Sequence, residues 1–281
     1  MFNTQVTEFL QSLNADYTRQ RYKAALKEFA VWYHTSYGVP PDATRLTDQE
    51  ARDWRAYLLT VRQLGASSVN LRLAALRSLA RHFRLSLRVQ GVQRVLPPVE
   101  PLTGRELGRL ISAVAGQRWL DKRNVAIISL LARAGLRVGE VVTVRIDDLT
   151  LSERKGQVVV RHGKGLKERI VPLNRQVRQD VRAYLEVRPS VVETTLFISR
   201  TGQPLANRDV QRLVADAARR AGLSRQVTPH TLRHTFATRA LRQGKIDLAT
   251  LSHLLGHSNL TTTARYLHPD QARVAEMIEE L

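Results

Sequence analysis

The chain has 281 residues, of which 44 are Lys or Arg and 25 are Asp or Glu, so its formal net charge is +19. An excess of this size favours a polyanionic partner, because each neutralised phosphate releases a condensed counterion. The absence of cysteine excludes disulfides, thiolate nucleophiles and Cys-ligated zinc.

The chain shows no sign of a membrane or secretion segment. Its longest apolar run, around residues 125–132, is too short to span a bilayer. The first ten residues, MFNTQVTEFL, lack the basic and apolar regions of a signal peptide. We therefore expect a cytoplasmic protein without a membrane partner.

Apolar residues at helical spacing predict an all-helical domain over residues 1–86. The first stripe contains Tyr22, Leu26, Phe29 and Tyr33. The second follows a capping box formed by Thr47 and Glu50, and contains Ala51, Trp54, Leu58 and Val61. The third contains Val69, Leu73, Leu76, Ala80 and Phe83.

The other face of this third helix carries a row of arginines: Arg72, Arg77, Arg81 and Arg84. Such a row is either a solvated helix face or a surface that follows phosphates. The excess positive charge of the whole chain favours the second interpretation, so these four residues are candidate DNA-binding residues.

Residues 87–101 contain a glycine, a Pro-Pro pair and no sustained period, and they predict an interdomain linker. A capping box of Thr103 and Glu106 then opens a second domain, residues 102–281. A mostly buried helix in RNVAIISLLARAGLR is expected to end near Gly135.

The clearest strand signal is a hairpin, with β-rich runs at 157–162 and 168–173. Helices are predicted at 174–187, 207–221 (Asn207 as cap), 229–243 (Thr228 as cap, Pro229 in the first turn) and 247–255 (Asp247 as cap, Gly256 past the end). The predicted fold class is mainly α with a small antiparallel β-sheet.

Several common catalytic signatures are missing. Asp147 and Asp148 are adjacent, but such a pair is more often a turn or surface pair than a metal site. The Gly-Lys-Gly at 163–165 lacks the other residues of a phosphate-binding Walker loop. No G-x-S-x-G nucleophile elbow is present. We therefore predict no metal and no cofactor.

Six residues stand in marked local contexts: Arg137 in GLRVGE, Lys164 in HGKGLKER, His230 and Arg233 in HTLRH, His257 in LLGHS and Tyr266 in TTTARYLH. Taken one at a time, all but Arg233 have a better structural explanation. Taken together, they fit attack on a phosphodiester. Two arginines grip phosphate oxygens and offset transition-state charge, a tyrosine attacks phosphorus, a lysine protonates the leaving alkoxide and histidines move protons.

At these residues the sequence resembles the tyrosine recombinase (phage integrase) family, over essentially the whole chain and most specifically within 135–268. The resemblance implies that Arg137 and Arg233 hold the phosphate, that Lys164 is the general acid, that His230 and His257 assist and that Tyr266 is the nucleophile. It implies supporting roles for Glu140 and His234.

The resemblance also implies a four-helix core-binding domain and a mixed α/β catalytic domain that clamp duplex DNA at a specific recombination site. It implies a synaptic tetramer, 3′-phosphotyrosyl linkages, a Holliday junction, and a nucleoid-associated protein when acting. The chain most resembles the Xer-type or simple transposon recombinases. Chromosome-dimer resolution, mobile-element integration or excision, and the need for a second recombinase are all left open.

The stretch 270–281 predicts a C-terminal helix with Val274, Ile278 and Leu281 on one stripe. It can pack on its own domain or on a neighbouring protomer. Two other functions compete with recombination for the whole chain. One is DNA binding without catalysis, and the other is DNA relaxation of the type IB topoisomerase kind.

Overall fold

The computed structural model describes residues 1–93, 100–161, 168–244 and 246–256. The chain divides into two compact units, Met1–Pro97 and Pro98–Leu281. The predicted C-terminal helix 270–281 lies outside the described residues.

Four helices form the N-terminal unit: α1 (Phe2–Gln11), α2 (Asp16–Tyr37), α3 (Asp48–Thr60) and α4 (Ala66–His82). Their apolar stripes meet in one core, in which Phe29, Trp54 and Leu73 are fully buried. The predicted capping box is present, since Thr47 accepts a hydrogen bond from the Glu50 backbone and the Glu50 carboxylate accepts one from Thr47.

The segment that follows α4 belongs to this core. Val89 is buried, and Leu87 and Val92 pack against the same cluster. The Asn70 amide donates to the Val92 carbonyl at 2.8 Å and accepts from the Val92 N–H at 2.7 Å. The first part of the predicted linker 87–101 is therefore packed onto the N-terminal unit, because its alternate apolar residues fit the face of α4.

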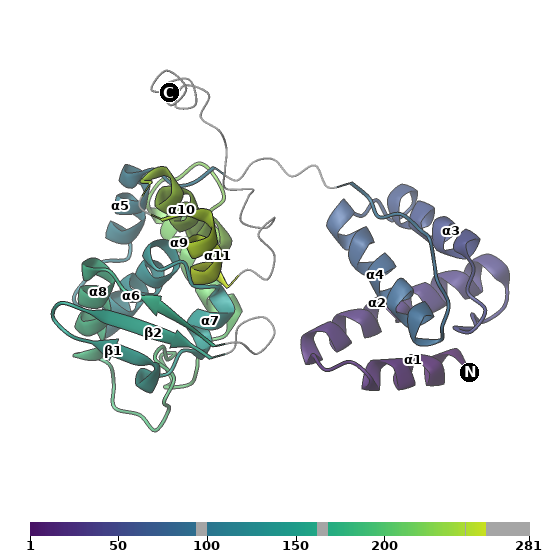
Figure 1. Ribbon diagram of the computed structural model, residues 1–281, viewed down its shortest axis with the longest axis horizontal. Helices are drawn as coiled ribbons and strands as arrows, with labels where there is room; N and C mark the ends of the chain where they lie inside the picture. Colours follow the sequence, from purple (N-terminus) through teal and green to yellow (C-terminus); the bar gives the residue numbers. More distant parts are fainter. Residues whose placement is uncertain (94–99, 162–167, 245, 257–281) are drawn as a thin grey trace, which may run out of the picture. The chain divides into compact units, whose positions relative to one another are not determined.

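The C-terminal unit mixes helices with one small sheet. Its helices are α5 (Gly104–Ser112), α6 (Trp119–Arg133), α7 (Val138–Thr143), α8 (Arg175–Leu185), α9 (Asn207–Arg220), α10 (Pro229–Arg242) and α11 (Leu248–Leu255), with a 3-10 turn η1 (Ile146–Asp148). Figure 1 shows the sheet at one end of this unit and α5 and α10 at the other.

The sheet contains β1 (Leu149–Leu151), β2 (Gly156–Val160) and β3 (Arg169–Pro172), in the order β1-β2-β3 with both pairs antiparallel. Val158 faces both neighbours, Leu149 on β1 and Val171 on β3. The predicted hairpin and fold class are confirmed. Helix α7 was not predicted, because a helix of six residues is too short to show a period.

Most predicted helix ends are also confirmed. Thr228 and Asp247 cap α10 and α11, and Gly256 ends α11 in the left-handed conformation, with φ of 61°. The prediction that Asn207 caps α9 is wrong. The helix already includes Asn207, and the carboxylate of Asp209 instead caps it by accepting from the Ala206 N–H at 2.9 Å.

Helix α6 is the centre of the C-terminal unit and contacts α7, α8, α9 and α10. It ends at Arg133, and Gly135 follows shortly after it with a φ of +70°, where a Cβ would collide with the ring of Phe236 on α10. Glycine therefore allows the turn after α6 to approach α10 closely. No helix in the described part of the chain has the length and apolar character needed to cross a membrane.

Candidate active site

Arg137 lies at the turn between α6 and α7, where it is the residue preceding the first helical position of α7. Its backbone N–H donates to Glu140 Oε2 at 2.8 Å, which satisfies one of the unpaired donors of the helix start. Its side chain donates from Nη1 to Glu140 Oε1 at 2.8 Å and from Nη2 to the Gly256 carbonyl at 2.7 Å. Both hydrogen bonds of the side chain fix the direction of the guanidinium group.

Arg233 approaches the same place from α10. Its side chain is only 4% exposed. It donates from Nη1 to the Gly135 carbonyl at 2.5 Å and from Nη2 to the Leu255 carbonyl at 2.6 Å. Its Nη1 also lies 4.0 Å from Glu140 Oε2. The guanidinium groups of Arg137 and Arg233, which lie far apart in the sequence, therefore converge on one carboxylate.

Glu140 is held mainly by an arginine that sequence reasoning missed. Arg169 donates from Nη1 and Nη2 to the two carboxylate oxygens at 2.9 and 2.8 Å. Both side chains of this pair are 5% exposed. The available signal was weak: Arg169 occupies an inward-facing position of the alternating strand β3, where an arginine requires an acidic partner.

The pKa of Glu140 shows how strongly the carboxylate is stabilised. Burial by itself raises the pKa of this carboxyl. The hydrogen bonds and charge of Arg169, together with the hydrogen bonds from Arg137, outweigh burial and lower the pKa from 4.5 to about 2. Glu140 is therefore ionised throughout the neutral range, and it is charged while buried among three cations.

The C-terminal end of α11 is tied to the same three arginines. Leu254, Leu255 and Gly256 offer their carbonyls to Arg169, Arg233 and Arg137 respectively. The last carbonyls of a helix lack internal partners and carry partial negative charge, so cations are favoured there. A Cβ on Gly256 would lie 3.0 Å from Arg169 Nη1 and 3.2 Å from Arg137 Nη1, so glycine permits this close approach.

The two histidines of α10 differ in environment. His230 is exposed in the first turn, one turn before Arg233. His234 is 8% exposed, and its Nε2 lies 3.5 Å from Thr238 Oγ1. The HTLRH stretch thus buries its arginine against the site and leaves His230 at the surface beside it.

The structure thus brings together Arg137, Glu140 and Arg233 of the predicted site, adds Arg169, and places His230 and His234 on the same helix as Arg233. Lys164, His257 and Tyr266 lie outside the described residues.

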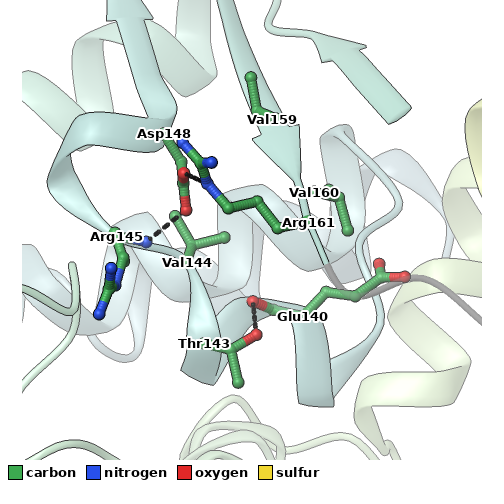
Figure 2. A pocket seen from close by; sticks show the side chains of 8 residues that line it. All are labelled: Glu140, Thr143, Val144, Arg145, Asp148, Val159, Val160 and Arg161. Atoms are coloured by element: carbon green, nitrogen blue, oxygen red, sulfur yellow. Dashed lines mark hydrogen bonds and ion pairs between the residues drawn. The ribbon is translucent and has the colours of Figure 1, made fainter. Parts of the chain in front are cut away.

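Asp147 is exposed, whereas the adjacent Asp148 is buried. Asp148 is 3% exposed and accepts from Arg161 Nε and, at 2.9 Å, from the Arg145 N–H (Figure 2). These groups line a small cavity of about 70 Å³, and the Glu140 carboxylate points away from Asp148 and Arg161. Among the described residues, no group of three or more His, Asp or Glu side chains could hold a metal ion.

The four candidate DNA-binding arginines of the N-terminal unit are not equivalent. Arg72 donates from Nε to Glu28 at 2.7 Å, and Arg77 donates to the Val89 carbonyl at 3.3 Å. Arg81 is exposed on α4, and Arg84 is exposed just beyond the end of this helix. The first two therefore hold the unit together, and the last two face solvent.

Comparison with known proteins shows the family of this chain. The model of the Phage integrase family matches residues 100–273. Tyrosine recombinase XerA of Thermococcus kodakarensis is 38% identical over 229 residues, which are 78% of this chain and 77% of XerA. Tyrosine recombinase XerC of Methylobacterium nodulans is 36% identical over 275 residues, covering 92% of this chain and 84% of that protein.

Solved structures share the architecture. A crystal structure of XerA recombinase aligns with 99% of this chain and 98% of its own, at 27% identity and a TM-score of 0.57. A XerH site-specific recombinase aligns with 92% of this chain and 78% of its own at a TM-score of 0.76, and at 22% identity it supports the fold alone.

The chain therefore belongs to the phage integrase family, the family of the tyrosine recombinases. Its similarity to XerA and XerC over most of its length places it among the Xer-type members, and it is a site-specific tyrosine recombinase that acts in DNA recombination.

Proposed function

We propose that this enzyme cleaves and rejoins DNA through a 3′-phosphotyrosyl intermediate at Tyr266. The Tyr266 phenol oxygen bonds to the scissile phosphorus as the bond from phosphorus to the 5′ oxygen breaks. Lys164 gives a proton to the departing 5′ oxygen. In the second step the 5′-hydroxyl of another strand attacks the phosphotyrosine and releases Tyr266. Two rounds of exchange pass through a Holliday junction.

The observation that supports this proposal is the convergence of Arg137 and Arg233 on Glu140. Guanidinium groups bind non-bridging phosphate oxygens through paired N–H donors. A phosphodiester gains negative charge as it becomes pentacoordinate, so fixed cations at this place stabilise the transition state more than the ground state. In this proposal arginine charge performs the role that metal ions perform in many phosphoryl-transfer enzymes.

The histidines complete the proposed chemistry. A free tyrosine has a pKa of about 10, so the proposed attack by Tyr266 as a phenolate requires a base or a cationic field. His230, exposed beside Arg233, and His257, which directly follows Gly256 in the chain, are the candidate proton carriers. His234 is buried on the same helix as His230 and is a candidate for structural support.

Covalent trapping tests this proposal. Nicked duplexes are selected from a random-sequence pool with the wild-type protein, and adducts are resolved under denaturing conditions. Wild type is expected to form an adduct, and Tyr266→Phe is expected to bind the same duplex without forming one. A wild type that binds its selected duplex but forms no adduct refutes the proposal in favour of DNA binding alone. Relaxation of plasmids that lack the selected site would favour a topoisomerase.

Duplex DNA with a specific recombination site is the proposed substrate. The net charge of +19 supports it. A XerH recombinase has been crystallised with its difH substrate, and a Tn1549 transposon integrase with transposon right end DNA. We propose that residues 1–86 and 102–281 clamp the duplex from two sides, with Arg81 and Arg84 following its phosphates.

We also propose that strand exchange takes place in a tetramer joined by the predicted helix 270–281. A groove of about 710 Å³ between β3, α8, α10 and α11 could accept such a helix. Apolar side chains such as Phe236 and Ile246 line it, and Arg133, Arg175 and Arg239 add positive charge. The predicted helix offers an apolar stripe with acidic neighbours, which complements both features.

Deletion of residues 270–281 tests the role of this helix in assembly. Loss of multimeric complexes on DNA, with monomer binding kept, is expected if neighbouring protomers exchange the helix. Unaltered assembly would refute exchange and leave packing within one protomer.

The cellular role is either chromosome-dimer resolution or integration and excision of a mobile element, with or without a second recombinase. Mapping covalent adducts on the genome of the source cell separates the two roles. Adducts at one chromosomal locus support the first, and adducts at element ends support the second. Either role would place the protein in the cytoplasm, on the nucleoid when acting.

A further inference from the structure

Arg169 lies at the candidate active site and is hydrogen-bonded inside the protein through all three of its guanidinium nitrogens. Its side chain is 5% exposed. It donates to both oxygens of Glu140 and to the Leu254 carbonyl. The guanidinium group of Arg169 therefore points into the protein. Any effect of Arg169 on DNA cleavage must act through the residues that it contacts.

Arg169 contributes to the net charge of the cluster formed by Arg137, Glu140, Arg169 and Arg233. Arg137, Arg169 and Arg233 bring three positive charges, and Glu140 brings one negative charge, which leaves two positive charges. A phosphodiester with one negative charge acquires a second in its pentacoordinate transition state. The cluster thus matches the transition state in charge, and without Arg169 it would be short by one.

The geometry explains why Glu140 needs a second arginine. Of the two carboxylate oxygens of Glu140, the Arg137 guanidinium group donates to Oε1 only, and Arg233 Nη1 lies 4.0 Å from Oε2. Arg169 contacts both oxygens at once, in the two-pronged arrangement that is strongest for an arginine and a carboxylate. With Arg169 removed, only Arg137 and Arg233 would compensate the negative charge of Glu140.

We propose that Arg169 is a positioning residue that acts through Glu140. It compensates the buried carboxylate, so that Arg137 and Arg233 keep both their orientation and their charge for the scissile phosphate. By holding the Leu254 carbonyl it also fixes the end of α11 against these arginines. This inference rests on the proposed phosphotyrosyl chemistry.

The test compares Arg169→Met, Arg169→Lys and the double variant Arg169→Met with Glu140→Gln. Each is assayed for adduct formation in a single turnover at saturating protein, on the nicked duplex selected by wild type. Affinity for that duplex and the melting temperature are measured separately. Arg188→Met is the control, because Arg188, like Arg169, donates to backbone carbonyls, in this case those of Pro189, Glu193, Thr195 and Leu196.

Arg169→Met is expected to form the adduct about 10–100 times more slowly, the usual effect of losing a residue that supports a functional group. Affinity should change little, because the lost interaction strengthens in the transition state. Arg169→Lys should reduce the rate of adduct formation less than Arg169→Met does, since lysine keeps the positive charge. The double variant should recover part of the loss, because removing both charges restores two positive charges. Arg188→Met should keep its rate.

Charge compensation is overturned if Arg169→Lys is as slow as Arg169→Met, or if the double variant is no faster than Arg169→Met. A purely structural role is indicated if Arg188→Met, at an equal loss of melting temperature, loses as much rate. If Arg169→Met forms the adduct at the wild-type rate, the inference is refuted while the proposed function stays intact. A wild type without any adduct removes the proposed function and this inference together.

Discussion

Glu140→Gln is expected to destabilise the protein by an amount that depends on pH. The substitution keeps the size of the side chain and removes the buried charge that Arg137 and Arg169 share. In the folded protein the pKa of Glu140 is about 2, against its ordinary value of 4.5. At about 1.36 kcal/mol for each pKa unit, this difference is worth about 3 kcal/mol of folding free energy at neutral pH.

The direction of the pH dependence follows from the lowered pKa. The stabilisation is fully present above the unfolded-state value of 4.5, and it is lost as the pH falls through the folded-state value of about 2. The difference in unfolding free energy between wild type and Glu140→Gln should therefore fall from about 3 kcal/mol at pH 7 to about 1 kcal/mol at pH 3.

Urea unfolding followed by circular dichroism, in steps between pH 7 and pH 3, measures this difference. Glu186→Gln is the control, because Glu186 is exposed at the end of α8, and its effect should stay within about 0.5 kcal/mol at every pH. A difference between wild type and Glu140→Gln that stays constant from pH 7 to pH 3 would refute the assignment of a strongly stabilised carboxylate at this position.

Three further predictions concern the fold and the DNA surface. Gly135→Ala should lower stability by about 1–3 kcal/mol in thermal unfolding, because of the positive φ and the collision with Phe236; an unchanged melting temperature would contradict this. Trp54→Ala should cost about 3–5 kcal/mol in urea unfolding, since its fully buried ring packs 4.8 Å from that of Phe29. If roughly ten phosphates are neutralised, log affinity for DNA should fall against log salt with a slope of about −9. Arg81→Ala should reduce that slope by about 1, while Arg72→Ala should leave it unchanged; equal effects would contradict the distinction between them.

Much of the local structure could be predicted from the sequence because the interacting groups are close neighbours in the chain. The Thr47–Glu50 and Thr103–Glu106 capping boxes each join residues three positions apart. The hairpin of β2 and β3 follows from two alternating runs around a short turn. The wrong cap at α9 shows the limit of such signals, because Asn207 and Asp209 compete for the same helix start and only the folded backbone selects one.

Identifying the residues of the candidate site required both the sequence motifs and the tertiary structure. Motif spacing pointed to Arg137, Glu140 and Arg233 because their contexts match a family pattern. Arg169 ends the same HGKGLKER stretch as Lys164, but it was given no role there, and its partner Glu140 lies 29 residues away. The same limit applies to Arg72, whose partner Glu28 lies 44 residues away.

The sequence by itself determined the helical stripes, most of the caps, the hairpin and the family, since these depend on short-range periodicity and on residue identity. Only the tertiary structure decided which arginines are internal and which face solvent, and how one buried carboxylate is shared. The physical reason is that a buried charge must find its counter-charge in space, and distance along the chain carries almost no information about which one it will be.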